Sequence, residues 1–142
     1  MLPKYHLILG LIFSSLLYWL LSLTIFQTIL VLLSSILIDV DHYLWYANRK
    51  KDISLKNSYF YLKKLSEKLK KPIIMLFHTI EFHILIGLLS FIWIGFFYIL
   101  IGMIFHSISD LLYLGNKNML YIREFSLIRY FILKNKDPKK YF

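Results

Sequence analysis

The stretch that decides the fold is residues 7–38, LILGLIFSSLLYWLLSLTIFQTILVLLSSILI, which contains no charged side chain and no histidine. As a single helix these 32 residues would extend about 48 Å, whereas the hydrocarbon core of a bilayer is about 30 Å thick. We therefore expect two membrane-spanning helices, over about 7–22 and 25–45. The turn between them is expected near residues 22–24.

The composition also indicates a membrane protein. Of the 142 residues, 58% are hydrophobic and 18% are charged, whereas soluble domains contain about 45–50% apolar and about 25% charged residues. A soluble domain of this length could not bury so much apolar surface, and disordered chains are poor in Leu, Ile and Phe. The lack of cysteine excludes disulfides, thiolate metal ligands and cysteine nucleophiles. The predicted fold class is all-α, an integral membrane helical bundle that forms one domain over residues 1–142.

A second apolar run follows a basic linker. Residues 84–105 contain no charged side chain and no histidine, and the apolar character extends from about 72 to 115. Two more spans are predicted here, over about 73–89 and 92–114, with a turn near Ser90. The alternative is one long tilted helix for each run, which would give two spans in all.

The basic residues favour four spans. Nine of the 17 Lys and Arg residues lie between residues 49 and 71, seven lie between 117 and 140, and the last is Lys4. With four spans, all three groups face the same side, which the positive-inside rule assigns to the cytoplasm. We therefore expect a multi-pass protein of the cell membrane with both termini cytoplasmic, a basic linker over 46–72 and a basic tail over 115–142.

The linker and the tail both mix basic and apolar residues at roughly helical spacing. This pattern is typical of amphipathic helices that lie on a membrane surface. The simpler interpretation is a topology signal with a solvated face, and the functional one is contact with anionic lipid, mainly through the linker. Membrane lipid is thus the expected partner. Nucleic-acid binding is not expected, because the charge is explained by orientation and no reading motif is present.

Nine titratable side chains lie within or at the ends of the apolar runs. A carboxylate at the membrane centre costs about 2.5–3.5 kcal/mol on insertion scales, so something must offset this cost. In the four-span topology all nine fall toward the cytoplasmic end, where we expect them to form one cluster. They are His6, Asp39, Asp41, His42, His78, Glu81, His83, His106 and Asp110.

The spacing of these residues suits a metal site. Three pairs share a helical face: His106 with Asp110, His78 with Glu81, and Asp39 with His42. Asp41 would point away from Asp39 in a regular helix, unless the helix ends at this sequence. Imidazoles and carboxylates without thiolates suit Zn²⁺, with Mn²⁺ or Fe²⁺ as alternatives, in one or more copies. Such an ion would offset the burial of the carboxylates and lower the pKa of a bound water.

Four motifs in order carry a family resemblance. They are His6-x3-Gly10, Asp39-Val-Asp41-His42, the histidines His78 and His83 five residues apart, and His106-x3-Asp110. This order resembles the H-x3-G, D-x-D-H, H-R-G-x-T-H and H-x3-D pattern of the YdjM-type membrane-bound metal-dependent hydrolases, over residues 6 to about 114. That family is related at a distance to zinc-dependent phospholipases C and P1-type nucleases, which are all-helical enzymes with a multi-zinc site.

The resemblance implies a hydrolase that acts on a phosphoester by metal-activated water, and the location suggests a lipid-linked head group at the cytoplasmic side. The expected metal ligands are His6, Asp39, Asp41, His42, His78, His83, His106 and Asp110. The third motif departs from the family, because Thr79 and Ile80 stand where the family has Arg and Gly. Glu81 is the candidate general base there, and Asp41 is the second candidate catalytic residue.

Three other functions remain open. A transporter of ions, protons or metal would also place ionisable residues in the membrane, although a pathway should extend across it rather than stay at one end. A metal-binding membrane protein without hydrolase activity would need the same ligands. A haem protein could use His42, His83 and His106 as axial ligands, but its carboxylates would then have no role.

Overall fold

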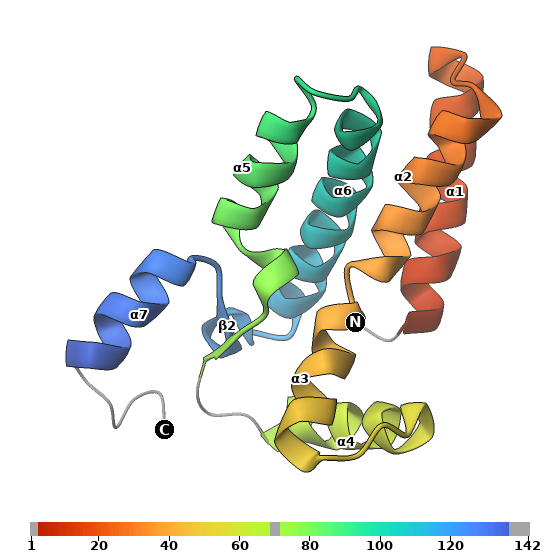
Figure 1. Ribbon diagram of the computed structural model, residues 1–142. Coiled ribbons are helices and arrows are strands. Elements are labelled where there is room, and N and C mark those ends of the chain that lie inside the picture. Colours follow the sequence, from red (N-terminus) through yellow and green to blue (C-terminus); the bar gives the residue numbers. More distant parts are fainter. Residues whose placement is uncertain (1–2, 69–71, 137–142) are drawn as a thin grey trace.

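The computed structural model of the chain describes residues 3–68 and 72–136 (Figure 1). The helices are α1 (Pro3–Leu21), α2 (Ile25–Leu37), α3 (Val40–Lys50), α4 (Leu55–Lys68), α5 (Ile80–Leu89), α6 (Gly95–Asn116) and α7 (Leu127–Lys136). Two 3₁₀ turns, η1 (Leu76–His78) and η2 (Leu120–Ile122), precede α5 and follow α6. Strands β1 (Ile73–Ile74) and β2 (Arg123–Glu124) form a parallel pair. The predicted all-α class is confirmed.

The first apolar run folds as two helices with a sharp turn. Ser22 adopts a left-handed conformation, with φ of 51°. Thr24 then begins α2 with a capping box: its hydroxyl accepts from the Gln27 amide at 3.2 Å, and its own amide donates to the Gln27 side chain at 2.8 Å. These bonds satisfy backbone donors that the start of a helix would leave unpaired, so the turn forms where the sequence predicts it.

Within the described part of the chain, three stretches are long and apolar enough to cross a membrane: Lys4–Leu21, Ile25–Lys50 and Gly95–Asn116. The second is broken at residues 38–39, where α2 ends and α3 begins. The predicted span over 25–45 is therefore two helices, and its helical part extends further, to Lys50. The first and last stretches lie close to the predicted spans over 7–22 and 92–114.

The predicted helix over 73–89 is shorter than expected. Residues 73–78 form β1 and η1, and only Ile80–Leu89 is helical. Thr79 has an extended backbone and caps α5, because its hydroxyl accepts from the Phe82 amide at 3.4 Å. The ten residues of α5 extend about 15 Å, roughly half of a hydrocarbon core.

The long helices pack side by side, with α2 against α1 and α6, and α5 against the other side of α6 (Figure 1). Small residues allow close approach. A side chain at Gly102 would collide with the Ser34 hydroxyl and the Val31 carbonyl, and one at Gly10 would collide with the Ser35 hydroxyl. Close approach of helices at such small residues is common in membrane proteins.

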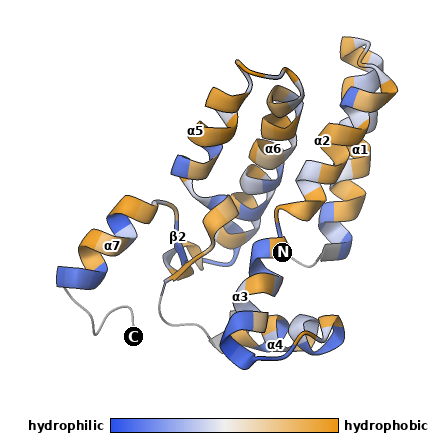
Figure 2. Cartoon of the chain, in the orientation of Figure 1, coloured by the Kyte–Doolittle hydropathy of each residue, from blue (hydrophilic) through white to orange (hydrophobic). Residues whose placement is uncertain are grey.

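Figure 2 shows apolar residues over these helices, while hydrophilic residues are frequent in α3, α4 and α7.

The basic linker predicted over 46–72 contains the end of α3 and all of α4, and its residues 69–71 lie outside the described part. Asp52 organises the connection between the two helices. It accepts hydrogen bonds from the Tyr46 hydroxyl, the Ser54 amide and the Asn57 side chain, at 2.5, 2.9 and 2.9 Å. These donors stabilise the carboxylate and hold the pKa of Asp52 below its usual value.

The basic tail predicted over 115–142 is more than a surface helix. Its amphipathic part is α7, which leaves Ile128, Phe131 and Ile132 exposed, and its residues 137–142 lie outside the described part. Before α7, the tail turns back at Asn118, whose φ is 53°, and passes through η2 into β2. There Arg123 pairs with Ile73 and Glu124 with Ile74, so the tail returns to the polar end of the bundle.

Candidate metal centre

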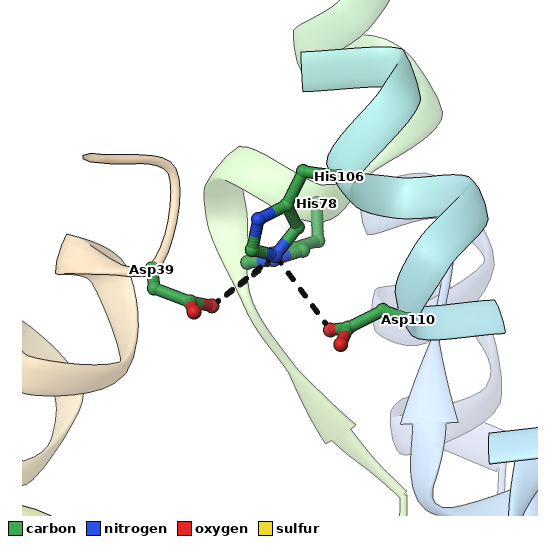
Figure 3. Close-up of side chains that lie close together, drawn as sticks. All are labelled: Asp39, His78, His106 and Asp110. Atoms are coloured by element: carbon green, nitrogen blue, oxygen red, sulfur yellow. Dashed lines mark hydrogen bonds and ion pairs between the residues drawn. The ribbon is translucent and has the colours of Figure 1, made fainter. Parts of the chain in front are cut away.

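Four side chains from three parts of the chain converge at one end of the bundle (Figure 3). Asp39 lies at the break between α2 and α3, His78 ends η1, and His106 and Asp110 lie one turn apart on α6. Each offers one ligand atom, and these atoms all lie within 4.8 Å of one another. We call this set the four-residue centre. Asp39 is partly exposed and the other three are buried.

The two histidines of the centre have defined tautomers. His106 Nδ1 lies 2.7 Å from the Ser35 carbonyl oxygen, and His78 Nδ1 lies 3.0 Å from Asp41 Oδ2. Both partners can only accept, so each Nδ1 carries the proton and each Nε2 presents a lone pair. The two Nε2 atoms face each other at 3.3 Å. Two lone pairs at this distance repel each other, so either a proton on one of the two nitrogens or a metal ion between them would stabilise the pair.

The break between α2 and α3 provides the partner of His106. In a continuous helix the Asp39 amide would bond to the Ser35 carbonyl, four residues earlier. Here it donates instead to Ile36, at 3.4 Å. The Ser35 carbonyl is therefore released to accept from His106.

The carboxylates complete a set with the dimensions of a metal site. Asp39 Oδ1 lies 3.4 Å from His106 Nε2 and 3.6 Å from His78 Nε2, and Asp110 Oδ2 lies 3.7 Å from His106 Nε2. Ligands about 2.0–2.1 Å from a tetrahedral ion lie about 3.3–3.4 Å from one another. The distances between these atoms are therefore close to those expected around a small divalent ion.

His6 lies against the same centre. Its ring stacks on that of His106 with centroids 3.8 Å apart, and its Nε2 lies 3.1 Å from Asp110 Oδ1. That approach is not aligned as a hydrogen bond, and no partner among the described residues satisfies this buried nitrogen. A buried polar nitrogen without a hydrogen bond is costly, and a metal ion would satisfy it, but His6 lies outside the sets whose ligand atoms are all within 4.8 Å of one another.

Asp41 and His42 form a second layer beside the centre. Asp41 Oδ2 accepts from His78 and from the Phe77 amide at 2.9 Å, and Oδ1 accepts from His42 Nδ1 at 2.8 Å. Both oxygens are therefore committed to donors, which suits a residue that orients His78. The ligand atoms of Asp41, His42 and His78 also lie close enough together to hold an ion. In a regular helix Asp41 would point away from Asp39. The break between α2 and α3 explains why both side chains nevertheless lie beside His78.

Glu81 and His83 have partners elsewhere. The Glu81 carboxylate accepts from the Ser126 hydroxyl at 2.5 Å and from the amides of Leu127 and Ile128 at 3.0 and 3.2 Å, so it caps the start of α7. His83 Nδ1 donates to the Thr79 carbonyl at 2.8 Å, and its Nε2 accepts from Ser107 at 3.2 Å. The structure thus does not bring these two predicted site residues into the four-residue centre.

Arg123 is the residue that the sequence analysis did not single out. Its Nη2 lies 2.7 Å from Asp110 Oδ2, and its side chain is 9% exposed. In sequence it is one basic residue among several in the tail. The pairing of β2 with β1 brings Arg123 back to the centre. Strands of only two residues are too short to produce a recognisable alternating pattern in the sequence.

The charges around the centre favour a divalent cation. Asp39, Asp41 and Asp110 contribute three negative charges, and Arg123 contributes one positive charge, so with neutral histidines these side chains sum to minus two. Net negative charge is costly where side chains are as buried as Asp110, which is 1% exposed, so this sum favours a cation. A divalent ion would bring the sum to zero. The charge, the ligand separations and the unsatisfied His6 nitrogen all agree with a metal ion.

Comparisons of the chain with protein-family models, with curated proteins and with solved structures returned no match. The likeness to membrane-bound metal-dependent hydrolases therefore rests on the four sequence motifs.

Proposed function

We propose that the protein is a membrane-embedded metal-dependent hydrolase, with a divalent ion held by Asp39, His78, His106 and Asp110. The separation of the ligand atoms, 3.3–3.7 Å between the atoms named above, is the observation that carries the proposal. A mixed set of imidazoles and carboxylates suits Zn²⁺, with Mn²⁺ or Fe²⁺ as alternatives. Such an ion supplies an activated water and polarises a substrate oxygen.

The surrounding residues have supporting roles in this proposal. Asp41 holds the His78 ring and the Ser35 carbonyl holds the His106 ring, each through Nδ1–H, so that Nε2 points into the centre. Such partners orient metal-binding histidines and raise their basicity. His6 is a further ligand. The exposed edges of the site are Asp39 and His42, whose side chains are 22% and 25% exposed, and a substrate would enter there.

A phosphoester or a lipid-linked head group is the substrate class that we propose. The sequence resemblance supports phosphoester chemistry, and the position of the centre supports access from a membrane surface. The centre lies at the same end of the long helices as α4, whose Lys56, Lys63 and Lys64 belong to the basic linker. The positive-inside rule would make that end cytoplasmic. In this topology α5 returns beside α6, so that the linker and tail share one side.

The first experiment is metal analysis of the detergent-purified protein by elemental mass spectrometry. We expect at least one equivalent of Zn, Mn or Fe in the wild type, and its loss in Asp110→Asn. Asp52→Asn is the matched control, because it changes another carboxylate that hydrogen-bonds within the α3–α4 connection. A wild type that holds no metal, even after metal is supplied, would contradict the proposal.

The second experiment separates hydrolysis from metal binding alone. The metal-loaded protein is incubated with a panel of soluble phosphoesters and phospholipids, and release of phosphate or head group is measured. Turnover that disappears in Asp110→Asn supports a hydrolase. A metal-loaded protein that turns over none of these substrates, but moves metal ions across liposome membranes, would instead be a transporter.

A further inference from the structure

Arg123 is held beside the centre by more than its own ion pair. Its strand, β2, lies parallel to β1, with Arg123 opposite Ile73. Just after β2, the Phe125 carbonyl accepts from the Ile80 amide at 2.9 Å. The Glu81 carboxylate then binds the Ser126 hydroxyl and the first amides of α7. The segment that carries Arg123 is therefore fixed to β1 through β2, and to the start of α5 through the residues that follow β2.

The Arg123 guanidinium has more donors than the protein uses. A guanidinium offers five N–H groups in a planar fork. Among the described residues, its one ion-pair partner is Asp110, through Nη2 at 2.7 Å. Its side chain is 9% exposed, and none of its nitrogens is both buried and without a partner, so its remaining donors lie where a ligand can reach them. Donors in such a position favour an additional acceptor with several oxygens.

Arg123 also decides whether an anion can approach the loaded centre. Without it, the three carboxylates of Asp39, Asp41 and Asp110 would leave a net negative charge even with a divalent ion in place. With it, the loaded centre is neutral. An anionic group that meets the ion would therefore not be repelled, and the guanidinium would supply charged hydrogen bonds beside it.

We propose that Arg123 binds a phosphoryl oxygen of the substrate next to the metal ion, and so selects for phosphoryl compounds. This inference rests on the proposed function, because it takes the four-residue centre to hold a divalent ion. The competing explanation is that Arg123 only balances the charge of Asp110. The two explanations differ in what Arg123 affects: the first predicts loss of anion affinity with metal retained, and the second predicts loss of metal.

The test uses the purified full chain carrying the ion found at the centre. Inorganic phosphate is titrated into it by isothermal calorimetry, and metal content is measured on the same samples. The variants are Arg123→Gln and Arg123→Lys. The matched control is Arg129→Gln, which removes the same charge from the neighbouring helix α7. Its side chain is 68% exposed and lies 3.6 Å from Glu124.

We expect Arg123→Gln to keep its metal and to bind phosphate about 10- to 100-fold more weakly, the range expected for hydrogen bonds to charged groups. Arg123→Lys should lose less, because it keeps the charge but not the planar fork. Arg129→Gln should match the wild type. Equal phosphate affinity in Arg123→Gln, or loss of its metal, would overturn the proposal.

The outcomes also separate this inference from the proposed function. A wild type that holds metal but does not bind phosphate would overturn the role of Arg123 alone. A wild type without metal would overturn the proposed function, and the inference with it. Two further titrations identify the source of the phosphoryl group: glycerol 3-phosphate for a soluble compound, and phosphatidic acid vesicles for a lipid head group. Binding of either that depends on Arg123 supports the proposal, and binding of neither contradicts it.

Discussion

Two segments of the chain contain predicted site residues, and they differ in how many of these residues reach the four-residue centre. On α6, His106 and Asp110 both reach the centre, as their spacing of four residues predicts. In the segment 78–83, only His78 does so, while Glu81 and His83 bond to α7 and to Ser107. The backbone explains the difference. Helix α6 is regular, whereas Thr79 is extended and separates η1 from α5. Sequence spacing predicts a shared face only where one regular helix carries both residues.

The comparison is tested most directly by replacing one histidine from each segment, His106 on α6 and His83 in the segment 78–83. We expect His106→Gln to lose more than about 100-fold in metal affinity, because it removes a ligand rather than a residue behind one. His83→Gln should retain near wild-type affinity, since His83 bonds to Ser107 and to a backbone carbonyl. A metal-binding titration in detergent measures both. Equal losses would contradict the assignment of His83 to a position outside the centre.

A second contrast lies within the Asp39-Val-Asp41-His42 motif. Asp39→Asn should abolish tight metal binding, because Asp39 faces both imidazole nitrogens. Asp41→Asn should lower the affinity by about 10- to 100-fold, the usual cost of losing a partner that orients a metal-binding histidine. The same titration applies, with circular dichroism to verify helix content. If Asp41→Asn proves the more damaging, the ion is held by Asp41, His42 and His78 rather than by the four-residue centre.

A smaller effect is expected for Glu81→Gln. The neutral amide accepts hydrogen bonds from the start of α7 less well than the carboxylate, and loss of a helix cap costs about 0.5–2 kcal/mol. Amide exchange should therefore accelerate at the first turn of α7, while metal content stays unchanged. If metal-loaded Glu81→Gln instead kept its α7 protection and lost turnover, Glu81 would be the general base that the sequence suggests.

The smallest effect is expected at the α3–α4 connection, which belongs to neither of the two segments compared. The pKa of Asp52 is held below its usual value, mainly by the Tyr46 hydroxyl. Its contribution to stability is therefore present above the usual pKa of an aspartate and is lost as the pH falls through the lowered one. Amide exchange in α4 should be faster in Asp52→Asn than in the wild type at pH 7, and this difference should shrink in acid. A difference that grows in acid would contradict this assignment.

The sequence predicted the parts of the fold that depend on regular helices. The turn near residues 22–24 and the course of α6 follow from the length of the apolar runs and their lack of charge. The break between α2 and α3 and the late start of α5 did not follow, because neither place contains a proline or glycine that would end a helix. In each, the preference of a polar side chain for one centre outweighs the preference of the backbone for a continuous helix.

The site was predictable where the polar residues stand out against an apolar background. His6, Asp39, His78, His106 and Asp110 are conspicuous for that reason, and the structure brings them together. The role of Arg123 was not predictable, because nothing in the sequence distinguishes one basic residue from the others in a basic tail. Its place depends on the turn at Asn118 and on the pairing of two short strands, which are set by tertiary contacts.

The interrupted helical hydrogen bonding at residues 35–39 has a consequence for protein engineering, because a more regular helix there would alter the surroundings of His106. A design that made α2 and α3 one straight helix would restore the hydrogen bond between the Asp39 amide and the Ser35 carbonyl. We expect that bond to raise the stability of the fold. It would also occupy the acceptor of His106 and turn Asp39 to another face. If the proposed function holds, screens for thermostable variants should therefore select against metal binding at this position.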